Sequence, residues 1–179
     1  MTTLITIVLV IAGLIALALI VALFTKSEYT VVREIGIGKS RGEVFEYVKY
    51  LKNQDHYNKW TMMDPNVRKD YRGTDATVGF VSTWDSDNRQ VGKGEMEIKK
   101  IAEGERVDYE IRFAKPFEAV SPAYIAIEDL SNGNSKVIWG FAGKLPYPMN
   151  IMLLFINIPG MLEKDMDTSL AKLKTILEK

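Results

Sequence analysis

The fold is decided by residues 149–179 at the end of the chain, which read MNIMLLFINIPGMLEKDMDTSLAKLKTILEK. The second half of this stretch places apolar side chains at spacings of three and four, the period that gives an α-helix one apolar face. These side chains are Leu162, Met166, Leu170, Leu173 and Leu177. Residues 149–158 are apolar almost all round and need cover from protein, ligand or lipid. We therefore expect one long or two-part helix, and what covers its first part is the central question.

Working outward from this helix, most of residues 27–143 reads as strands separated by turn residues. Residues 107–113 alternate strictly between apolar and charged side chains, which gives a strand one buried and one solvated face. The other expected strands are 27–38, 67–72, 78–84, 91–101, 118–130 and 136–143. Asn132 and Gly133 predict a hairpin between the last two.

Two short helices are expected between the first strand and the rest of the sheet. Ser40 and Glu43 have the spacing of a capping box, so the first helix begins near Arg41, and a second follows over residues 53–60. A sheet with one apolar face must bury that face, and the terminal helix is the large apolar partner left for it. The order predicts an α+β fold in which a curved antiparallel sheet wraps around a long C-terminal helix.

Residues 4–24 contain no charged side chain and are long enough to cross a bilayer as a helix. A cleavable signal peptide is the alternative, but no Lys or Arg precedes the run, and the run exceeds the usual apolar length of such peptides. We expect an uncleaved single-pass anchor over residues 1–26 and one domain over residues 27–179. Lys26, Arg33, Lys39 and Arg41 follow the span, so the positive-inside rule predicts a cytoplasmic domain at the membrane.

Composition removes several classes of function. The chain of 179 residues has 23 Lys and Arg against 23 Asp and Glu, and no basic cluster, so a nucleic-acid partner has little electrostatic support. With no Cys and one His, thiolate chemistry and most metal or haem sites are excluded. We expect no metal and no cofactor.

Several stretches of the chain resemble the START-like helix-grip superfamily, also called SRPBCC or polyketide cyclase/dehydrase-like, and especially its small bacterial membrane-anchored members. The stretches that carry the resemblance are residues 27–31, 44–48, 57–60, 63–66, 84–88, 91–94 and 143–148. The resemblance covers roughly residues 27–179. It implies a cavity between the concave sheet and the C-terminal helix that can hold an apolar molecule.

Aromatic and methionine side chains on the buried faces suit such a cavity, because rings and thioethers adapt to irregular ligands. The candidate ligand-binding residues are Trp60, Trp84, Met96, Tyr109, Phe113, Trp139, Phe141, Met152 and Phe155. The simpler alternative for each residue is that it fills a solid core.

Polar candidates are few, and each has a simpler interpretation. Glu128 and Asp129 lie near a strand end and fit a solvated rim, and His56 fits an exposed helix position. Arg33 interrupts the first strand's alternation and either anchors an anionic ligand group or forms a salt bridge to a neighbouring strand. The oxygen-rich run 85–88 is expected to be a hairpin turn, since it lacks the Gly and distal Glu of a calcium loop.

Three functions follow from these features. The first is a membrane-anchored domain that binds a hydrophobic, lipid-like ligand, in which residues 149–158 either gate the cavity as a lid or contact lipid. The second is an enzyme of the cyclase or dehydratase type, which ranks lower because no His or carboxylate set converges. The third is a structural or partner-binding domain whose cavity is filled by side chains.

Overall fold

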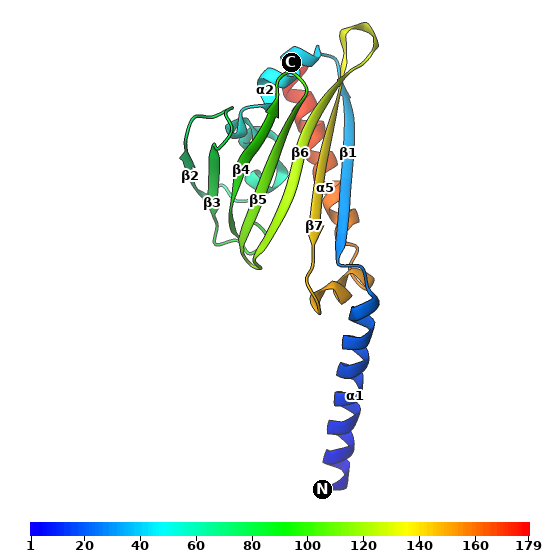
Figure 1. The fold of residues 1–179 in the computed structure, drawn as a ribbon. Coiled ribbons are helices and arrows are strands. Elements are labelled where there is room, and N and C mark those ends of the chain that lie inside the picture. The colour runs from blue at the N-terminus through cyan, green and yellow to red at the C-terminus, as the bar shows by residue number, and fades with distance from the viewer.

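The computed structural model describes residues 1–179. It consists of a curved antiparallel sheet, a long C-terminal helix on one face of that sheet, and an N-terminal helix that projects away from both (Figure 1). The elements in chain order are α1 (Thr2–Phe24), β1 (Glu28–Ile37), α2 (Arg41–Val48), η1 (Leu51–Asn53), α3 (Gln54–Tyr57), α4 (Lys59–Met62), β2 (Arg68–Arg72), β3 (Val81–Asp85), β4 (Lys93–Ala102), β5 (Arg106–Lys115), β6 (Ala119–Asp129), η2 (Ser131–Gly133), β7 (Ser135–Lys144), η3 (Met149–Leu154) and α5 (Ile158–Leu177).

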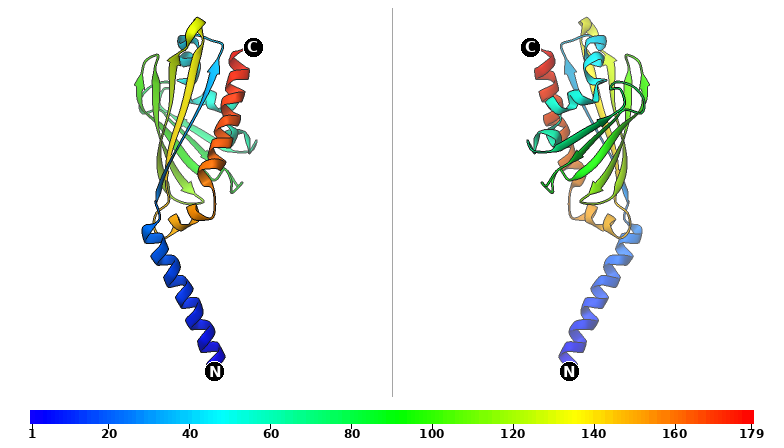
Figure 2. Two further views of the ribbon diagram at one scale, coloured as in Figure 1. Left: turned by 90° about the vertical axis from the view of Figure 1, so that its right-hand side faces the viewer. Right: turned by 90° about the vertical axis from the view of Figure 1, so that its left-hand side faces the viewer.

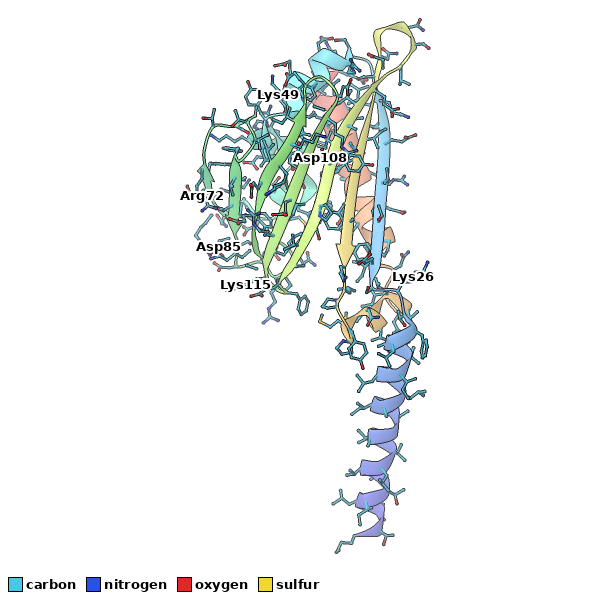
Figure 3. The ribbon with its side chains drawn as sticks, viewed as in Figure 1. Lys26, Lys49, Arg72, Asp85, Asp108 and Lys115 are labelled. Atoms are coloured by element: carbon cyan, nitrogen blue, oxygen red, sulfur yellow. The ribbon has the colours of Figure 1, made fainter.

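The sheet has seven strands in the order β1-β7-β6-β5-β4-β3-β2, and every neighbouring pair is antiparallel. The alternation predicted for β5 is confirmed, because Val107, Tyr109 and Ile111 are buried on the concave face. The convex face is charged: Arg112 forms ion pairs of 2.7 Å with Glu95 and 2.8 Å with Glu97. Figure 3 shows charged side chains along the sheet pointing outward to solvent. One face is therefore wet and the other is covered.

The cover of the concave face comes mainly from α5, which lies along the sheet in both views of Figure 2. Met166, Leu170 and Leu173 are fully buried, as the periodicity predicts. The Asn157 side chain accepts a hydrogen bond of 3.0 Å from the backbone N–H of Gly160 and so caps the start of the helix. The predicted two-part helix and the α+β fold with a sheet around it are confirmed.

Two helical segments close the upper part of the concave face. The capping box at the start of α2 is present, with Ser40 and Glu43 each satisfying a free backbone N–H. The single helix expected over residues 53–60 is instead two one-turn helices, α3 and α4. They are separated at Asn58, whose backbone is extended and whose side chain accepts from the backbone N–H of Trp60. The cap thus starts a new helix where continuous helix was expected.

Helix α1 extends away from the domain and buries one residue, Ala22 (Figure 2). Its 23 residues give a length of about 35 Å. By length and composition it is able to cross a membrane, a test that an N-terminal signal sequence also passes.

The segment before α5 is only partly covered by the protein. Residues 149–158 were expected to be covered by protein, ligand or lipid, and the protein leaves Leu154 57% and Phe155 80% exposed. The reason is position: η3 lies at the end of the sheet beside the C-terminal end of α1, beyond the concave face.

Candidate ligand-binding pocket

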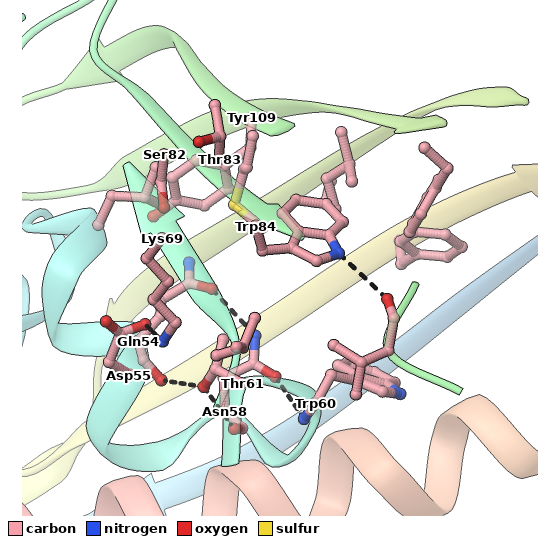
Figure 4. Close-up of a pocket in the computed structure, with 18 of the residues that line it drawn as sticks. Gln54, Asp55, Asn58, Trp60, Thr61, Lys69, Ser82, Thr83, Trp84 and Tyr109 are labelled. Atoms are coloured by element: carbon pink, nitrogen blue, oxygen red, sulfur yellow. Dashed lines mark hydrogen bonds and ion pairs between the residues drawn. The ribbon is translucent and has the colours of Figure 1, made fainter. Parts of the chain in front are cut away.

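A pocket of about 210 Å³ lies on the concave side of the sheet, where the short helices α3 and α4 and the helix α5 face strands β2 to β7 (Figure 4). Its walls are mostly apolar, and polar side chains gather where α3 approaches β2 and β3. An apolar cavity of about 150 Å³ holds benzene, whereas drug-sized ligands occupy roughly 300–1,000 Å³. The pocket therefore matches a molecule of one or two rings, or a short chain.

Seven of the nine residues predicted from the sequence line this pocket. They are Trp60, Trp84, Met96, Tyr109, Phe113, Trp139 and Phe141. Their strand members share the concave face because strand residues two positions apart point to the same side. Contact of these residues with a ligand remains a prediction.

Met152 and Phe155 lie elsewhere. Both are exposed around η3, and no residue between 149 and 158 lines the pocket. The sequence interpretation treated η3 as the mouth of the cavity and placed the break at Pro159 and Gly160. In the structure these two residues lie in the first turn of α5, the helices are interrupted at residues 155–157, and η3 contacts α1. The lid hypothesis therefore has no geometric support in this structure.

One wall is built around Trp84 on β3. Its indole N–H donates to the backbone oxygen of Val91 at 3.1 Å, and its ring meets Phe113 edge-on with centroids 6.0 Å apart. The ring lies over Gly94 on β4, where an added Cβ would stand 2.5 Å from the indole Cζ2. Gly94 is thus a residue that the sequence interpretation missed and that the position of Trp84 requires.

The opposite wall is an aromatic cluster centred on Trp139 of β7. Its ring meets Trp60 edge-on at 6.2 Å and Tyr57 edge-on at 6.3 Å between centroids. The backbone of Trp60 is fixed by a hydrogen bond of 3.1 Å from its N–H to the Asn58 side chain. Edge-to-face pairs of this kind fix ring orientation, so this wall is pre-formed.

The polar end of the pocket centres on two buried amides, Gln54 and Asn58, which are 3% and 4% exposed. The Asn58 Nδ2 donates to Gln54 Oε1 at 3.1 Å, and Thr61 donates to the backbone oxygens of both residues. Sequence reasoning missed this pair because the stretch looks polar and solvated. The available signal was spacing, since residues three and seven positions after buried Leu51 share its helical face.

Four further polar side chains lie near the amides. Lys69 on β2 forms an ion pair of 2.7 Å with Asp55 on α3, and Tyr71 donates to the same carboxylate at 2.8 Å. Tyr109 is buried, and burial raises the pKa of its phenol well above the ordinary value, while a hydrogen bond with Gln54 opposes that shift. The Tyr109 phenol is therefore neutral at physiological pH.

The remaining polar candidates lie outside the pocket. His56, Glu128 and Asp129 are exposed. Arg33 forms a 2.7 Å salt bridge with Asp167 of α5, where the sequence interpretation expected a partner on a strand. Residues 86–92 connect β3 and β4, as expected for the oxygen-rich run 85–88.

Comparison with solved structures identifies the type of fold. No protein-family model matches the chain, and no curated protein matches it. Among solved structures, norcoclaurine synthase from Thalictrum flavum, in complex with dopamine and hydroxybenzaldehyde, aligns with a TM-score of 0.63 and 10% identity over 89% of this chain and 92% of that one. The protein Ara h 8.0201 aligns with a TM-score of 0.56 and 14% identity over 85% and 99% of the two chains. Both have the helix-grip fold.

This chain has a helix-grip fold. A hypothetical protein from Helicobacter pylori gives a similar alignment, with a TM-score of 0.62 and 12% identity over 84% of this chain and 88% of that one. At these identities the likeness carries the fold alone, because one fold hosts many activities. It agrees with the superfamily that the sequence resembles at the level of architecture.

Proposed function

We propose that this chain is a membrane-tethered helix-grip domain that binds a small hydrophobic molecule. Residues 1–26 form the tether and residues 27–179 the binding domain. The observation that carries the proposal is the 210 Å³ pocket, with three tryptophans in its walls and a buried amide pair at one end. An apolar pocket with a few placed polar groups is the usual form of a small-molecule site. The positive charges after the span favour a cytoplasmic domain.

The lining indicates the chemistry of the ligand. The apolar walls select a ring or a short hydrocarbon chain, and the volume excludes a lipid with two acyl chains from lying wholly inside. At the polar end, Lys69 is already paired with Asp55, so the groups that face the ligand are neutral amides and phenol. A hydroxyl or carbonyl fits these partners better than a free charge, which would be desolvated there.

Binding ranks above the two alternatives for physical reasons. Acid–base catalysis needs a group whose pKa lies near the operating pH, and the Tyr109 pKa is moved away from neutrality by burial. A domain whose cavity is filled by its own side chains would leave room for a water or two, and this pocket is larger.

The test uses intrinsic fluorescence, because all three tryptophans of the chain line the pocket. The full chain in lipid nanodiscs is titrated with para-bromophenol, whose bromine quenches nearby indoles. We expect saturable quenching, and weaker binding of bromobenzene, which lacks the hydroxyl for the amide end.

A matched pair of variants tests whether para-bromophenol binds in this pocket. Ala123→Leu fills the pocket from the concave face of β6, and Ala126→Leu makes the same change on the convex face of that strand. Saturable quenching should be lost in the first and kept in the second. Equal quenching in both variants, or none in the parent chain, contradicts the proposal.

A further inference from the structure

An apolar surface lies at the end of the domain where α1 joins it. Residues 145–162 contain no Asp, Glu, Lys, Arg or His. Four of its exposed side chains lie close together in sequence, and we call them the apolar wedge: Met152, Leu154, Phe155 and Ile156. Water-exposed apolar clusters mark surfaces that bind something apolar.

The wedge is fixed to the end of α1. Asn150 is 3% exposed, and its side-chain N–H groups donate to the backbone oxygens of Ala22 at 2.7 Å and Thr25 at 2.8 Å. Ala22 lies in the last turn of α1, where its carbonyl also accepts from the backbone N–H of Thr25, the residue that ends the helix. Figure 1 shows the orange segment that carries η3 beside the blue end of α1. The wedge is therefore held beside the end of α1 that joins the domain.

The backbone of the wedge suits an apolar medium. A chain can enter lipid only when its backbone polar groups are satisfied internally. The backbone N–H groups of Phe155 and Ile156 donate to the oxygen of Met152 at 3.1 and 2.8 Å, and that of Ile151 donates to Pro148 at 3.3 Å. The turn therefore exposes side chains to its surroundings while several of its N–H groups stay paired.

Residues around the wedge have the character of a membrane interface. Phe24, the last residue of α1, and Tyr147, just before η3, are both exposed, and aromatic rings concentrate at the level of lipid headgroups. Lys26 follows the last turn of α1 and lies at the same junction in Figure 3. A lysine there reaches the headgroup region while its stem stays apolar.

We propose that the apolar wedge is a second membrane contact, which enters the interfacial region of the leaflet from which α1 emerges. This inference rests on the membrane tether of the proposed function and adds a fixed orientation to it. Two contacts, α1 and the wedge, hold the domain at one angle to the bilayer. The wedge continues into α5 at Ile158, and α5 lines the pocket with Leu162 and Met166, so the membrane contact and the pocket share one helix.

The chain has no cysteine, so a single introduced cysteine can be labelled specifically with a probe. Single cysteines replace Leu154 in the wedge, Leu14 in α1 and Leu130 at the far end of the sheet, all of them exposed. Each full-length variant is labelled with a nitrobenzoxadiazole dye and reconstituted into phosphatidylcholine vesicles. Quenching is measured with nitroxide-labelled lipid and with aqueous iodide.

The three probe positions distinguish failure of the wedge proposal from failure of the tether proposal. We expect the probes at 154 and 14 to be quenched by nitroxide lipid and shielded from iodide severalfold relative to the probe at 130. A probe at 154 that behaves like that at 130, while 14 is in lipid, overturns the wedge and leaves the tether intact. A probe at 14 that behaves like that at 130 overturns the tether, and the wedge with it. Shielding from iodide at 154 without lipid quenching identifies a protein partner, such as a second copy, and also overturns the lipid assignment.

A charge substitution provides the second readout. In the Leu154→Cys background, Phe155→Asp should raise iodide quenching at 154, because a carboxylate is costly to place in the interface. Val78→Asp introduces the same charge at an exposed apolar residue in the connection between β2 and β3 and should leave the probe unchanged. No change with Phe155→Asp contradicts the proposal.

Discussion

Single residues determine the shape of the pocket, and Gly94 is the clearest example. Its missing side chain leaves the space that the indole of Trp84 occupies, and a Cβ there would also stand 2.6 Å from the backbone oxygen of Arg112. Because one of the three clashing atoms belongs to the backbone, side-chain movement alone does not relieve the crowding.

The Gly94→Ala substitution should therefore displace Trp84 and reshape the pocket. We expect a loss of stability of about 1–3 kcal/mol, typical of overpacking, together with weaker quenching by para-bromophenol. Thermal unfolding and the fluorescence titration measure the two effects. Gly42→Ala is the control, because nothing lies within 4 Å of an added Cβ at this helical position. Unchanged titration of Gly94→Ala would show that the wall does not depend on Trp84.

Residue-level prediction from sequence was strong for strands and weak for the connections. Tyr109 and Phe113 were placed correctly, because strict alternation fixes which face a strand residue occupies. Gln54 and Asn58 were missed because amides near a helix break resemble surface residues until their burial is known. Gly94 was missed because its role depends on a ring from the neighbouring strand, which local patterns do not encode.

At the level of elements, α2 shows how a short local signal fixes a helix start. Its capping box was predicted from Ser40 and Glu43 and is present. The hydrogen bonds from Ser40 lower the pKa of Glu43 below its ordinary value of 4.5, since they favour the charged carboxylate. A carboxyl group with a lowered folded-state pKa stabilises the protein above its unfolded pKa, and that stabilisation is lost as the pH falls through the folded value.

The contribution of the capping box should therefore depend on pH in one direction. The melting temperature of Glu43→Gln should lie below that of the parent by a constant amount at neutral pH, and the difference should shrink as the pH falls below 4.5. Glu105→Gln is the control, because Glu105 is an exposed glutamate without an ion pair. Thermal unfolding at a series of pH values measures the difference. A gap that widens in acid would exclude this role for Glu43.

The segment before α5 shows what a sequence pattern cannot predict. The period of α5 identified its buried face, but the all-apolar character of residues 149–158 showed only that these residues avoid water. Their partner depends on the hydrogen bonds of Asn150 to α1, which join residues more than a hundred positions apart. For this reason Met152 and Phe155 were assigned to the pocket when they lie beside α1.

For the whole molecule, the arrangement separates two apolar surfaces that the sequence could not distinguish. One is concave and lines the pocket, and the other surrounds the junction of α1 and η3. Only the first is covered by the protein. The fold as a whole was predictable because element order and one apolar sheet face leave few ways to bury that face.

This separation predicts the behaviour of the domain without its tether. In a fragment of residues 27–179, Asn150 loses the Ala22 and Thr25 acceptors, and the wedge loses its only neighbour outside the domain. We expect concentration-dependent self-association by sedimentation velocity, because an exposed apolar cluster with no lipid pairs with its own kind. Saturable quenching by para-bromophenol should persist, since the pocket is formed by residues 51–166.

Two double variants locate the cause of this self-association. Leu154→Lys with Phe155→Lys should return the fragment to a monomer, because the two ammonium groups make the wedge surface soluble. Val78→Lys with Leu130→Lys adds the same charge at exposed apolar sites in the connection between β2 and β3 and after β6, and it should leave association unchanged. A fragment that is monomeric at every concentration, or that both variants dissociate equally, would show that the wedge is not the surface the tether protects.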